Sequence, residues 1–329
     1  MSDVKANNDV KDVKIGFIAD GVKQFSKKDI FHDSSFALML ATQELKAKIL
    51  LTGSNNLKII NNKVFANFDE IDVKQEAGNH IHVKESYECS LDSLDIIFAR
   101  KVPPVNENFI SYLQMLTLVQ NVLIINKPNG VLGANEKLYA LNFPDLIPPT
   151  LVSSNKNEIV DFLNEYGEAV IKPLFNKGGE GVFYLNKNDL NGANLLIDSS
   201  ISNGKFSLAQ MFIKEVKLGD KRIILLNGHP IGALLRIPKP GEFRANMNQG
   251  ASIAKCELRK RDLEICEELK PYLIKDGLYF AGIDVIDKYL TEVNVTSPTC
   301  LQEIERFTHR KLAREIVEWA IEKRLIVGI

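Results

Sequence analysis

Residues 281–300 read AGIDVIDKYLTEVNVTSPTC, and the two short runs of β-branched residues in this stretch predict a β-hairpin. The register of the hairpin decides which side chains share a face, because side chains alternate along a strand. A two-residue turn would place Asp284 opposite Thr291. A three-residue loop would place Asp284 opposite Glu292 and would keep Asn294 on the same face. We expect the second register.

The expected loop, residues 287–289, gives the hairpin a chemical use. One face then carries isoleucine and valine side chains toward a core, and the other carries two carboxylates and an amide oxygen. Such oxygen ligands are those that Mg²⁺ takes together with substrate phosphates. The alternative is a surface hairpin with a polar face, and this stretch alone favours neither reading.

Composition excludes several classes of protein. The 329 residues are too many for one simple core and indicate two or three subdomains. Lys+Arg 41 against Asp+Glu 42 gives a net charge of −1, so we expect neither a nucleic-acid nor a membrane partner. The four cysteines are scattered, without a C-x-x-C pair, which is typical of reduced thiols. We therefore expect a cytoplasmic protein.

The first third of the chain alternates strand and helix patterns. Apolar runs at residues 14–20, 94–100 and 122–126 predict strands, and a helix is expected over residues 107–120. Such alternation predicts an open, mostly parallel sheet, with ligands at the carboxyl ends of its strands. Residues 1–12 are polar and predict a disordered tail.

A glycine-rich stretch follows at residues 169–185, AVIKPLFNKGGEGVFYL. Glycine loops bind phosphates because backbone N–H groups converge on the anion where no Cβ intervenes. The β-branched and aromatic residues on both sides predict strand–loop–strand. A Rossmann dinucleotide turn and a P-loop both require a helix after the glycines and are excluded. Lys172 ends the first strand, where an ammonium group can meet a phosphate.

A second hairpin is predicted around Asn227-Gly228, with Arg222 and Arg236 on its two strands. Residues 236–252 then read RIPKPGEFRANMNQGAS. A long segment so rich in Gly, Pro and Asn inside a compact protein predicts an active-site lid or a disordered segment.

A lysine before a glycine-rich hairpin, arginines on a later hairpin and a D-x₇-E-x-N face together resemble the ATP-grasp carboxylate–amine ligases. The resemblance is closest to the prokaryotic-type glutathione synthetases. The chain contains, in the order of that family, the motifs HDSSFA, ARKVPP, NEKL, IKPL…GGxGVF, AQMFI, GDKR, RIP, GIDVI and TEVNVTSPTC. The last of these is the most specific.

The resemblance implies an α/β fold with several parts. After the disordered tail over residues 1–12, we expect an N-terminal α/β pre-ATP-grasp domain with an open parallel sheet over residues 13–128. An ATP-grasp lid subdomain is expected over residues 129–206 and a C-terminal ATP-grasp domain over residues 207–329. The family also implies a homo-oligomer, a dimer or a tetramer.

The implied reaction joins γ-glutamylcysteine to glycine through an acyl phosphate and gives glutathione, ADP and phosphate. The implied cofactors are ATP and Mg²⁺, or Mn²⁺. Another ATP-grasp ligase with a different acyl donor or amine is the alternative. A non-catalytic ATP-binding regulator is less favoured, because the carboxylates and lysines of the site are all present.

The resemblance also implies roles for individual residues. Those implied for ATP binding are Lys137, Lys172, Gly178, Gly179, Gly181, Gln210, Met211, Phe212, Ile213 and Asp220. The implied metal ligands are Asp284, Glu292 and Asn294. The residues implied to act near the acyl phosphate are Arg222, Arg236 and Asn294. Those implied to line the peptide-substrate side are Asp33, Ser34, Arg100, Ser297 and Thr299.

Two departures from the family pattern concern the substrate side. Val102 follows Arg-Lys where an aspartate is usual, and the lid ends in Gly250-Ala251, where Gly-Gly-Arg is usual. The first departure bears on contacts to the peptide substrate and the second on lid closure. Arg244 remains in the lid as a candidate replacement, and neither departure touches the implied ATP and metal residues.

Overall fold

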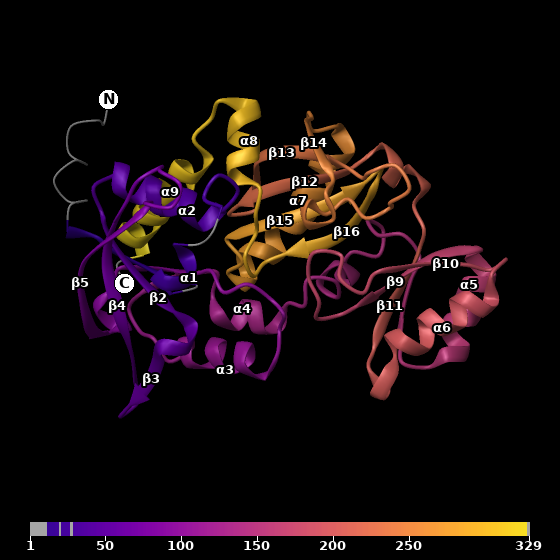
Figure 1. Cartoon of the computed structure of the whole chain (residues 1–329), viewed down its shortest axis with the longest axis horizontal. Helices are drawn as coiled ribbons and strands as arrows, with labels where there is room; N and C mark the ends of the chain where they lie inside the picture. Colours follow the sequence, from indigo (N-terminus) through magenta and orange to yellow (C-terminus); the bar gives the residue numbers. More distant parts are fainter. Residues whose placement is uncertain (1–11, 20, 27–28, 328–329) are drawn as a thin grey trace.

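The computed structural model describes residues 12–19, 21–26 and 29–327. These residues form three β-sheets with helices packed on them, and Figure 1 shows the sheets spread along the long axis of the molecule. The disordered tail that we expect over residues 1–12 lies outside the described residues, except for Asp12. Among the described helices, none combines the length and the apolar character that a membrane span needs.

The sheet of the N-terminal part is mixed. Its parallel half has the order β2–β1–β6–β7, with β2 at Lys48–Gly53, β1 at Lys14–Ala19, β6 at Ile96–Ala99 and β7 at Leu123–Ile125. Next to β2 lies the antiparallel strand β4 (Lys63–Val73), which also pairs with β3 (Leu57–Ile60) and β5 (Ile81–Ser90). The strand–helix alternation therefore predicts the parallel half, and three antiparallel strands extend the sheet beyond it.

Helices cover both faces of this sheet because neighbouring residues of its strands point in opposite directions. Phe17 belongs to the apolar cluster under α2 (Ser34–Glu44) and α9 (Leu312–Val327), whereas Ile18 belongs to the cluster under α3 (Glu107–Leu116). The C-terminal helix α9 thus packs beside α2 at the N-terminal end of the molecule (Figure 1). Two short helices complete this part, α1 (Val22–Phe25) and α4 (Pro128–Gly133).

The second sheet has four antiparallel strands and its own apolar core. Its order is β10–β9–β11–β8, with β8 at Thr150–Ser153, β9 at Glu168–Pro173, β10 at Phe183–Asn186 and β11 at Ser207–Met211. The helices α5 (Lys156–Tyr166) and α6 (Leu190–Ser200) pack on it. The sheet extends to Met211 and so passes residue 206, where we expect the lid subdomain to end.

The third sheet has five antiparallel strands in the order β14–β13–β12–β15–β16. These strands are β12 (Asp220–Leu226), β13 (His229–Ile237), β14 (Ser252–Lys255), β15 (Phe280–Ile286) and β16 (Tyr289–Asn294). The helices α7 (Lys260–Asp276) and α8 (Leu301–Thr308) belong to this part. Asn227 and Gly228 form the two-residue turn predicted between β12 and β13, with φ of 50° and 77°.

The β15–β16 hairpin places Asp284 opposite Glu292, as predicted, although the predicted loop is wrong. The turn contains two residues, 287 and 288, rather than three, because the strands pair directly on either side of them. A β-bulge follows Asp284 in the pairing, so that Thr291 is an extra residue in the second strand. A regular two-residue hairpin would place Asp284 opposite Thr291, and the bulge places it opposite Glu292 instead.

Candidate active site

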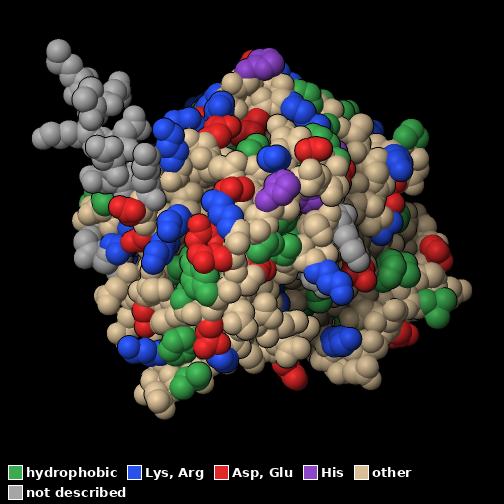
Figure 2. Space-filling view, turned by 60° about the vertical axis from the view of Figure 1, so that its left-hand side comes forward, with side chains coloured by type: hydrophobic (Ala, Val, Ile, Leu, Met, Phe, Trp, Pro, Cys, Tyr) green, Lys and Arg blue, Asp and Glu red, His purple; other side chains and the backbone are tan. Residues whose placement is uncertain are grey.

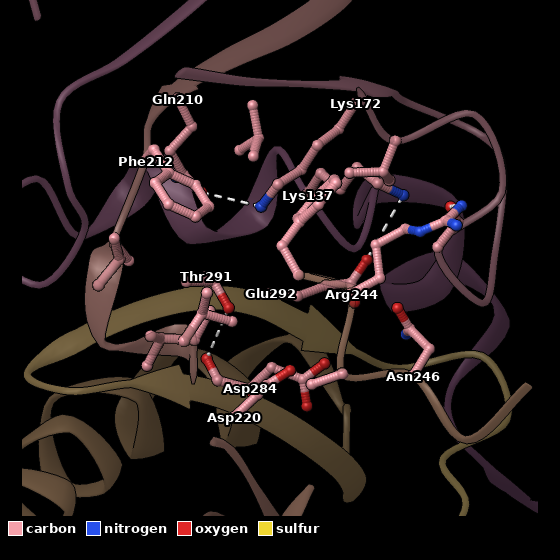
Figure 3. Close-up of a pocket in the computed structure, with 18 of the residues that line it drawn as sticks. Lys137, Lys172, Gln210, Phe212, Asp220, Arg244, Asn246, Asp284, Thr291 and Glu292 are labelled. Carbon is pink, nitrogen blue, oxygen red and sulfur yellow. Dashed lines mark hydrogen bonds and ion pairs between the residues drawn. The ribbon is translucent and has the colours of Figure 1, made fainter. Parts of the chain in front are cut away.

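A cavity lies between the four-stranded and five-stranded sheets. Figure 3 shows Lys172 and Gln210 on one side of this first cavity and Asp220 and Asp284 on the other. Of the residues predicted to bind ATP, those in its lining are Lys137, Lys172, Gly178, Gly179, Gln210, Met211, Phe212, Ile213 and Asp220. Asp284 and Glu292 line it as well, so the structure brings these distant segments together.

Two arginines hold the carboxylate of Asp284. Arg222 donates from Nε to Oδ1 at 2.5 Å and from Nη2 to Oδ2 at 2.9 Å, and Nη2 of Arg236 lies 3.0 Å from Oδ1. Burial by itself raises the pKa of Asp284, but the two guanidinium groups outweigh it and hold the pKa below its usual range. Asp284 is therefore a carboxylate at neutral pH, although it is only 3% exposed.

Asp220 shares one of these arginines but is less well satisfied. Its Oδ2 accepts a hydrogen bond from Nη2 of Arg236 at 2.5 Å, whereas its Oδ1 is buried and has no partner among the described residues. Burial raises the pKa of Asp220 to about 6, opposed by the charge of Arg236 and reinforced by that of Asp284. A buried oxygen without a partner at a cavity wall is available to a ligand or a water.

The two lysines predicted to bind ATP reach the cavity from different segments. Lys172 is the residue before the last one of β9, and its Nζ donates to Oε1 of Gln210 at 2.9 Å. Burial lowers the pKa of this lysine. Nζ of Lys137 donates to the backbone oxygen of Asn176 at 2.9 Å and lies 3.4 Å from Oε1 of Glu292. Both ammonium groups therefore lie within hydrogen-bonding reach of cavity residues.

The glycine loop between β9 and β10 lies against the segment over residues 236–252, which is called the lid below. Gly178 and Gly179 have φ of 63° and 78°, which residues with a side chain rarely adopt. A Cβ on Gly179 would lie 2.6 Å from Oδ1 of Asn246 in the lid. Arg244 of the lid also contacts Gly179, because its Nη1 donates a hydrogen bond to the backbone oxygen of this glycine at 3.3 Å. Glycine is needed here for both the backbone conformation and the close approach.

Aromatic rings form the side of the first cavity near Phe212. The ring of Tyr184 meets that of Phe212 edge-on at a centroid distance of 4.9 Å, and Phe243 of the lid lies 6.2 Å from Phe212. Phe212 and Phe243 both line the cavity. This apolar end is suited to a planar base, whereas the lysine and carboxylate end is suited to phosphates.

A second cavity adjoins the first, and Gly178, Asn246 and Glu292 line both. Its lining includes Arg222, Arg236, Asn294, Ser297 and Thr299 from the predicted site. Val102, the departure from the family pattern, also lines it and is 40% exposed. The arginine–carboxylate cluster therefore lies where the two cavities meet.

Three residues predicted on the peptide-substrate side lie outside the lining of both cavities. Oδ1 of Asp33 caps α2 by accepting from the backbone nitrogens of residues 35 and 36. The hydroxyl of Ser34 accepts from the backbone nitrogen of Leu301 at 3.3 Å. Arg100, 3% exposed, donates from Nη2 to the backbone oxygen of Pro298 at 2.8 Å. The side chains of Ser34 and Arg100 therefore hold the two sides of the loop that carries Ser297 and Thr299.

Glu136 is a site residue that the sequence analysis does not single out. Its Oε1 accepts from the backbone nitrogens of Val295 and Thr296, each at 3.2 Å, and from the Thr296 hydroxyl at 2.7 Å. Burial and the nearby charge of Glu292 raise its pKa. The available signal is its place in the NEKL motif, directly before Lys137. Glu136 thus ties the end of β16 to the segment of that lysine.

The donor set on the hairpin fits a hard divalent cation. Asp284 and Glu292 share one face, and Nδ2 of Asn294 donates to Asp284 at 3.4 Å, which leaves its Oδ1 free of hydrogen bonds to described residues. The part of the chain described here holds no cluster of three or more His, Cys, Asp or Glu side chains arranged as a metal site. The ligands would therefore be two carboxylates and one amide oxygen, a set that suits Mg²⁺ completed by phosphate and water.

Solved structures of two synthetases share this fold. A D-cycloserine synthetase matches with a TM-score of 0.68 at 13% identity, covering 95% of this chain and 99% of its own. A D-alanyl-alanine synthetase of Vibrio cholerae matches with a TM-score of 0.59 at 11% identity, covering 96% and 99%. The fold and the site, together with an ATP-grasp domain profile that matches residues 136–309, define an ATP-grasp ligase, an ATP-dependent enzyme.

Sequence comparison narrows this class. The profile of the prokaryotic glutathione synthetase N-terminal domain matches residues 13–131, and that of the ATP-grasp domain matches residues 136–309. A glutathione synthetase of Nostoc sp. is 41% identical over 325 residues, which cover 95% of this chain and 99% of the relative. One of Coxiella burnetii is 39% identical over 297 residues, covering 89% and 91%. The chain belongs to the prokaryotic glutathione synthetase family.

Proposed function

We propose that this protein is a glutathione synthetase that ligates γ-glutamylcysteine to glycine and converts ATP to ADP and phosphate. The observation that carries the proposal is the meeting of two cavities at one charged cluster. The first cavity has an aromatic end and a lysine end, as ATP requires, and the second is lined by polar side chains suited to a peptide. Arg222, Arg236 and Asp284 lie between them.

In the first step, an oxygen of the cysteinyl carboxylate attacks the γ-phosphorus of ATP. A new P–O bond forms, the bond to the β-phosphate oxygen breaks, and ADP leaves. Lys137, Lys172 and the backbone of Gly178 and Gly179 would hold the phosphates in line, because phosphoryl transfer depends on positioning and charge neutralisation. The Phe212 end of the cavity would hold the adenine.

In the second step, the amine of glycine attacks the carbonyl carbon of the acyl phosphate. The C–N bond forms, the amine loses a proton, and the C–O bond to phosphate breaks. The guanidinium groups of Arg222 and Arg236, which line the second cavity, would stabilise the negative charge that develops on the departing phosphate and the carbonyl oxygen. Their pairing with Asp220 and Asp284 fixes their positions before the substrates arrive.

Asp284, Glu292 and Asn294 would hold Mg²⁺ or Mn²⁺, which neutralises phosphate charge when bound. We also propose that the enzyme is cytoplasmic and acts as a homo-oligomer. The four cysteines are all free thiols, which supports a reducing compartment. Family membership supports the oligomer, and light scattering of the purified protein would test it.

The test of the reaction is ADP and phosphate release with γ-glutamylcysteine and glycine, with glutathione identified by mass. Turnover only with another donor or amine would replace this proposal by a different ATP-grasp ligase.

We expect Glu292→Gln to lower turnover by about 100-fold or more, because it removes a carboxylate from the metal site. The matched control is Glu318→Gln on α9, whose carboxylate is exposed and pairs with Arg314. Circular dichroism should show both variants folded. Full activity of Glu292→Gln would refute the metal assignment.

A further inference from the structure

One charged side chain of the second cavity has no role in the reaction described so far. Lys177 lies on the glycine loop, directly before Gly178, and is exposed. Lys177 lines the second cavity but is absent from the lining of the first. The loop therefore offers its glycine backbone to the first cavity and a cation to the second.

The charges around the second cavity show which cation is free to bind a substrate. The cations in its lining, among the described residues, are Lys177, Arg222 and Arg236. Two carboxylates, Asp220 and Asp284, already balance the two arginines. The ammonium group of Lys177 has no hydrogen bond or ion pair to any described residue. It is the lining cation whose charge remains uncompensated.

The proposed substrates bring carboxylates that need such a partner. The reacting carboxylate of the donor must lie at the arginine cluster, and Ser297 and Thr299 line the cavity from the loop after β16. Lys177 and the lid residues Asn246 and Asn248 line the same cavity from other segments of the chain, the glycine loop and the lid. A glycine placed there would keep its carboxylate at the ammonium group while its amine faces the acyl carbon.

We propose that Lys177 binds the carboxylate of the amino-acid acceptor and makes the enzyme selective for acceptors with a free carboxylate. This inference rests on the proposed function. A single charge-assisted contact of this kind accounts for a change in affinity of roughly 10- to 100-fold. The ammonium group also suits an exposed loop, because its flexible stem can follow a small substrate.

The test compares Lys177→Met, which keeps the length of the side chain, with Lys177→Arg, which keeps its charge. Steady-state rates are measured with glycine and with glycinamide, whose neutral amide replaces the carboxylate. We expect Lys177→Met to raise the KM for glycine about 10- to 100-fold. Its kcat/KM for glycinamide and its KM for ATP should not change, and Lys177→Arg should retain most of the preference for glycine.

The matched control is Lys205→Met, which removes an exposed lysine from the same part of the chain outside both cavities. It should behave as the wild type. Three results would overturn the role of Lys177: an unchanged KM for glycine, an equal loss with glycinamide, or a rise confined to γ-glutamylcysteine or ATP. A wild-type protein that forms no ADP with γ-glutamylcysteine and glycine would instead overturn the proposed function.

Discussion

Glu136 lines the second cavity and also sets the position of the strand that carries Glu292. Its carboxylate accepts three hydrogen bonds from Val295 and Thr296, and Lys137 beside it lies 3.4 Å from Glu292. The strand that carries Glu292 and Asn294 is therefore fixed at its end by the segment that also carries a lysine of the first cavity.

We expect Glu136→Leu to lower the free energy of unfolding by about 2–4 kcal/mol, because it leaves buried donors at Val295 and Thr296 without an acceptor. Glu136→Gln keeps an acceptor oxygen and should lose less than half as much. Chemical denaturation measures both, and a titration of activity with Mg²⁺ should show weaker activation for the leucine variant alone. Equal stability of the two variants would contradict the assigned contacts.

Lys172 gives a prediction for pH. Burial lowers its pKa below the ordinary 10.5, so the ammonium group loses its proton at a lower pH than an exposed lysine does. The charged form is the one that binds phosphate, and we therefore expect the KM for ATP to rise as pH increases toward 10. Lys172→Arg keeps its charge throughout this range and should remove the rise. If the KM of Lys172→Arg for ATP rises in the same way at alkaline pH, a group other than Lys172 causes the rise.

Among the secondary-structure elements, the glycine loop and the lid depend on each other. Gly179 and Gly78 have nearly the same φ, 78° and 79°, but a Cβ at Gly179 meets Asn246 of the lid at 2.6 Å, whereas one at Gly78 meets nothing within 4 Å. Alanine at either position introduces similar backbone strain, on the order of 1 kcal/mol. A comparison of alanine at the two positions therefore distinguishes the effect of backbone strain, which both share, from that of the collision with Asn246, which only Gly179 has.

We expect Gly179→Ala to raise the KM for ATP and lower kcat by about tenfold or more, because the lid can no longer lie against the loop. Gly78→Ala should lose a similar amount of stability and keep its activity. Thermal denaturation and steady-state kinetics of both variants check this. Comparable activity in both would show that the loop–lid contact has no part in catalysis.

The same elements show how far sequence reasoning reaches. The Asn227-Gly228 turn and the strand–loop–strand form of the glycine segment follow from local backbone chemistry, and both predictions are confirmed. The loop of the β15–β16 hairpin is predicted wrongly, because a β-bulge at Thr291 leaves no mark in a pattern of alternating residues. The contacts of Glu136 depend on chain separations of about 160 residues, which no local signal records.

The molecule as a whole joins its first and last parts behind the second cavity. Helix α9 packs on α2, and Asn126 after β7 donates through Nδ2 to the backbone oxygens of Phe280 and Val295, each at 2.7 Å. Composition and motif order predict the separate parts of the molecule but not these contacts between its first and last parts. On the face that Figure 2 shows, acidic and basic side chains are interspersed, in keeping with the net charge of −1.

Arg100 links the N-terminal part to the loop after β16, which carries Ser297 and Thr299. Its Nε donates to the Ser35 hydroxyl at 3.0 Å, its Nη2 to the backbone oxygen of Pro298, and its guanidinium lies 5.3 Å from the ring centre of Phe280. Burial lowers its pKa to about 10, which still leaves it charged at neutral pH. It therefore bridges α2 to the loop that carries Ser297.

We expect Arg100→Ala to lower the free energy of unfolding by about 2–4 kcal/mol, because it removes buried packing and leaves the Pro298 oxygen without its donor. The KM for γ-glutamylcysteine should rise and that for ATP should not, since the first cavity does not contact this bridge. Arg314→Ala is the control: Arg314 is 40% exposed and pairs with Glu318 one turn away, so its loss should change stability by about 0.5 kcal/mol or less. Chemical denaturation and steady-state kinetics of the two variants compare the loss of a buried bridging arginine with the loss of a surface arginine. An unchanged KM of Arg100→Ala for both substrates would show that the loop keeps its shape without Arg100.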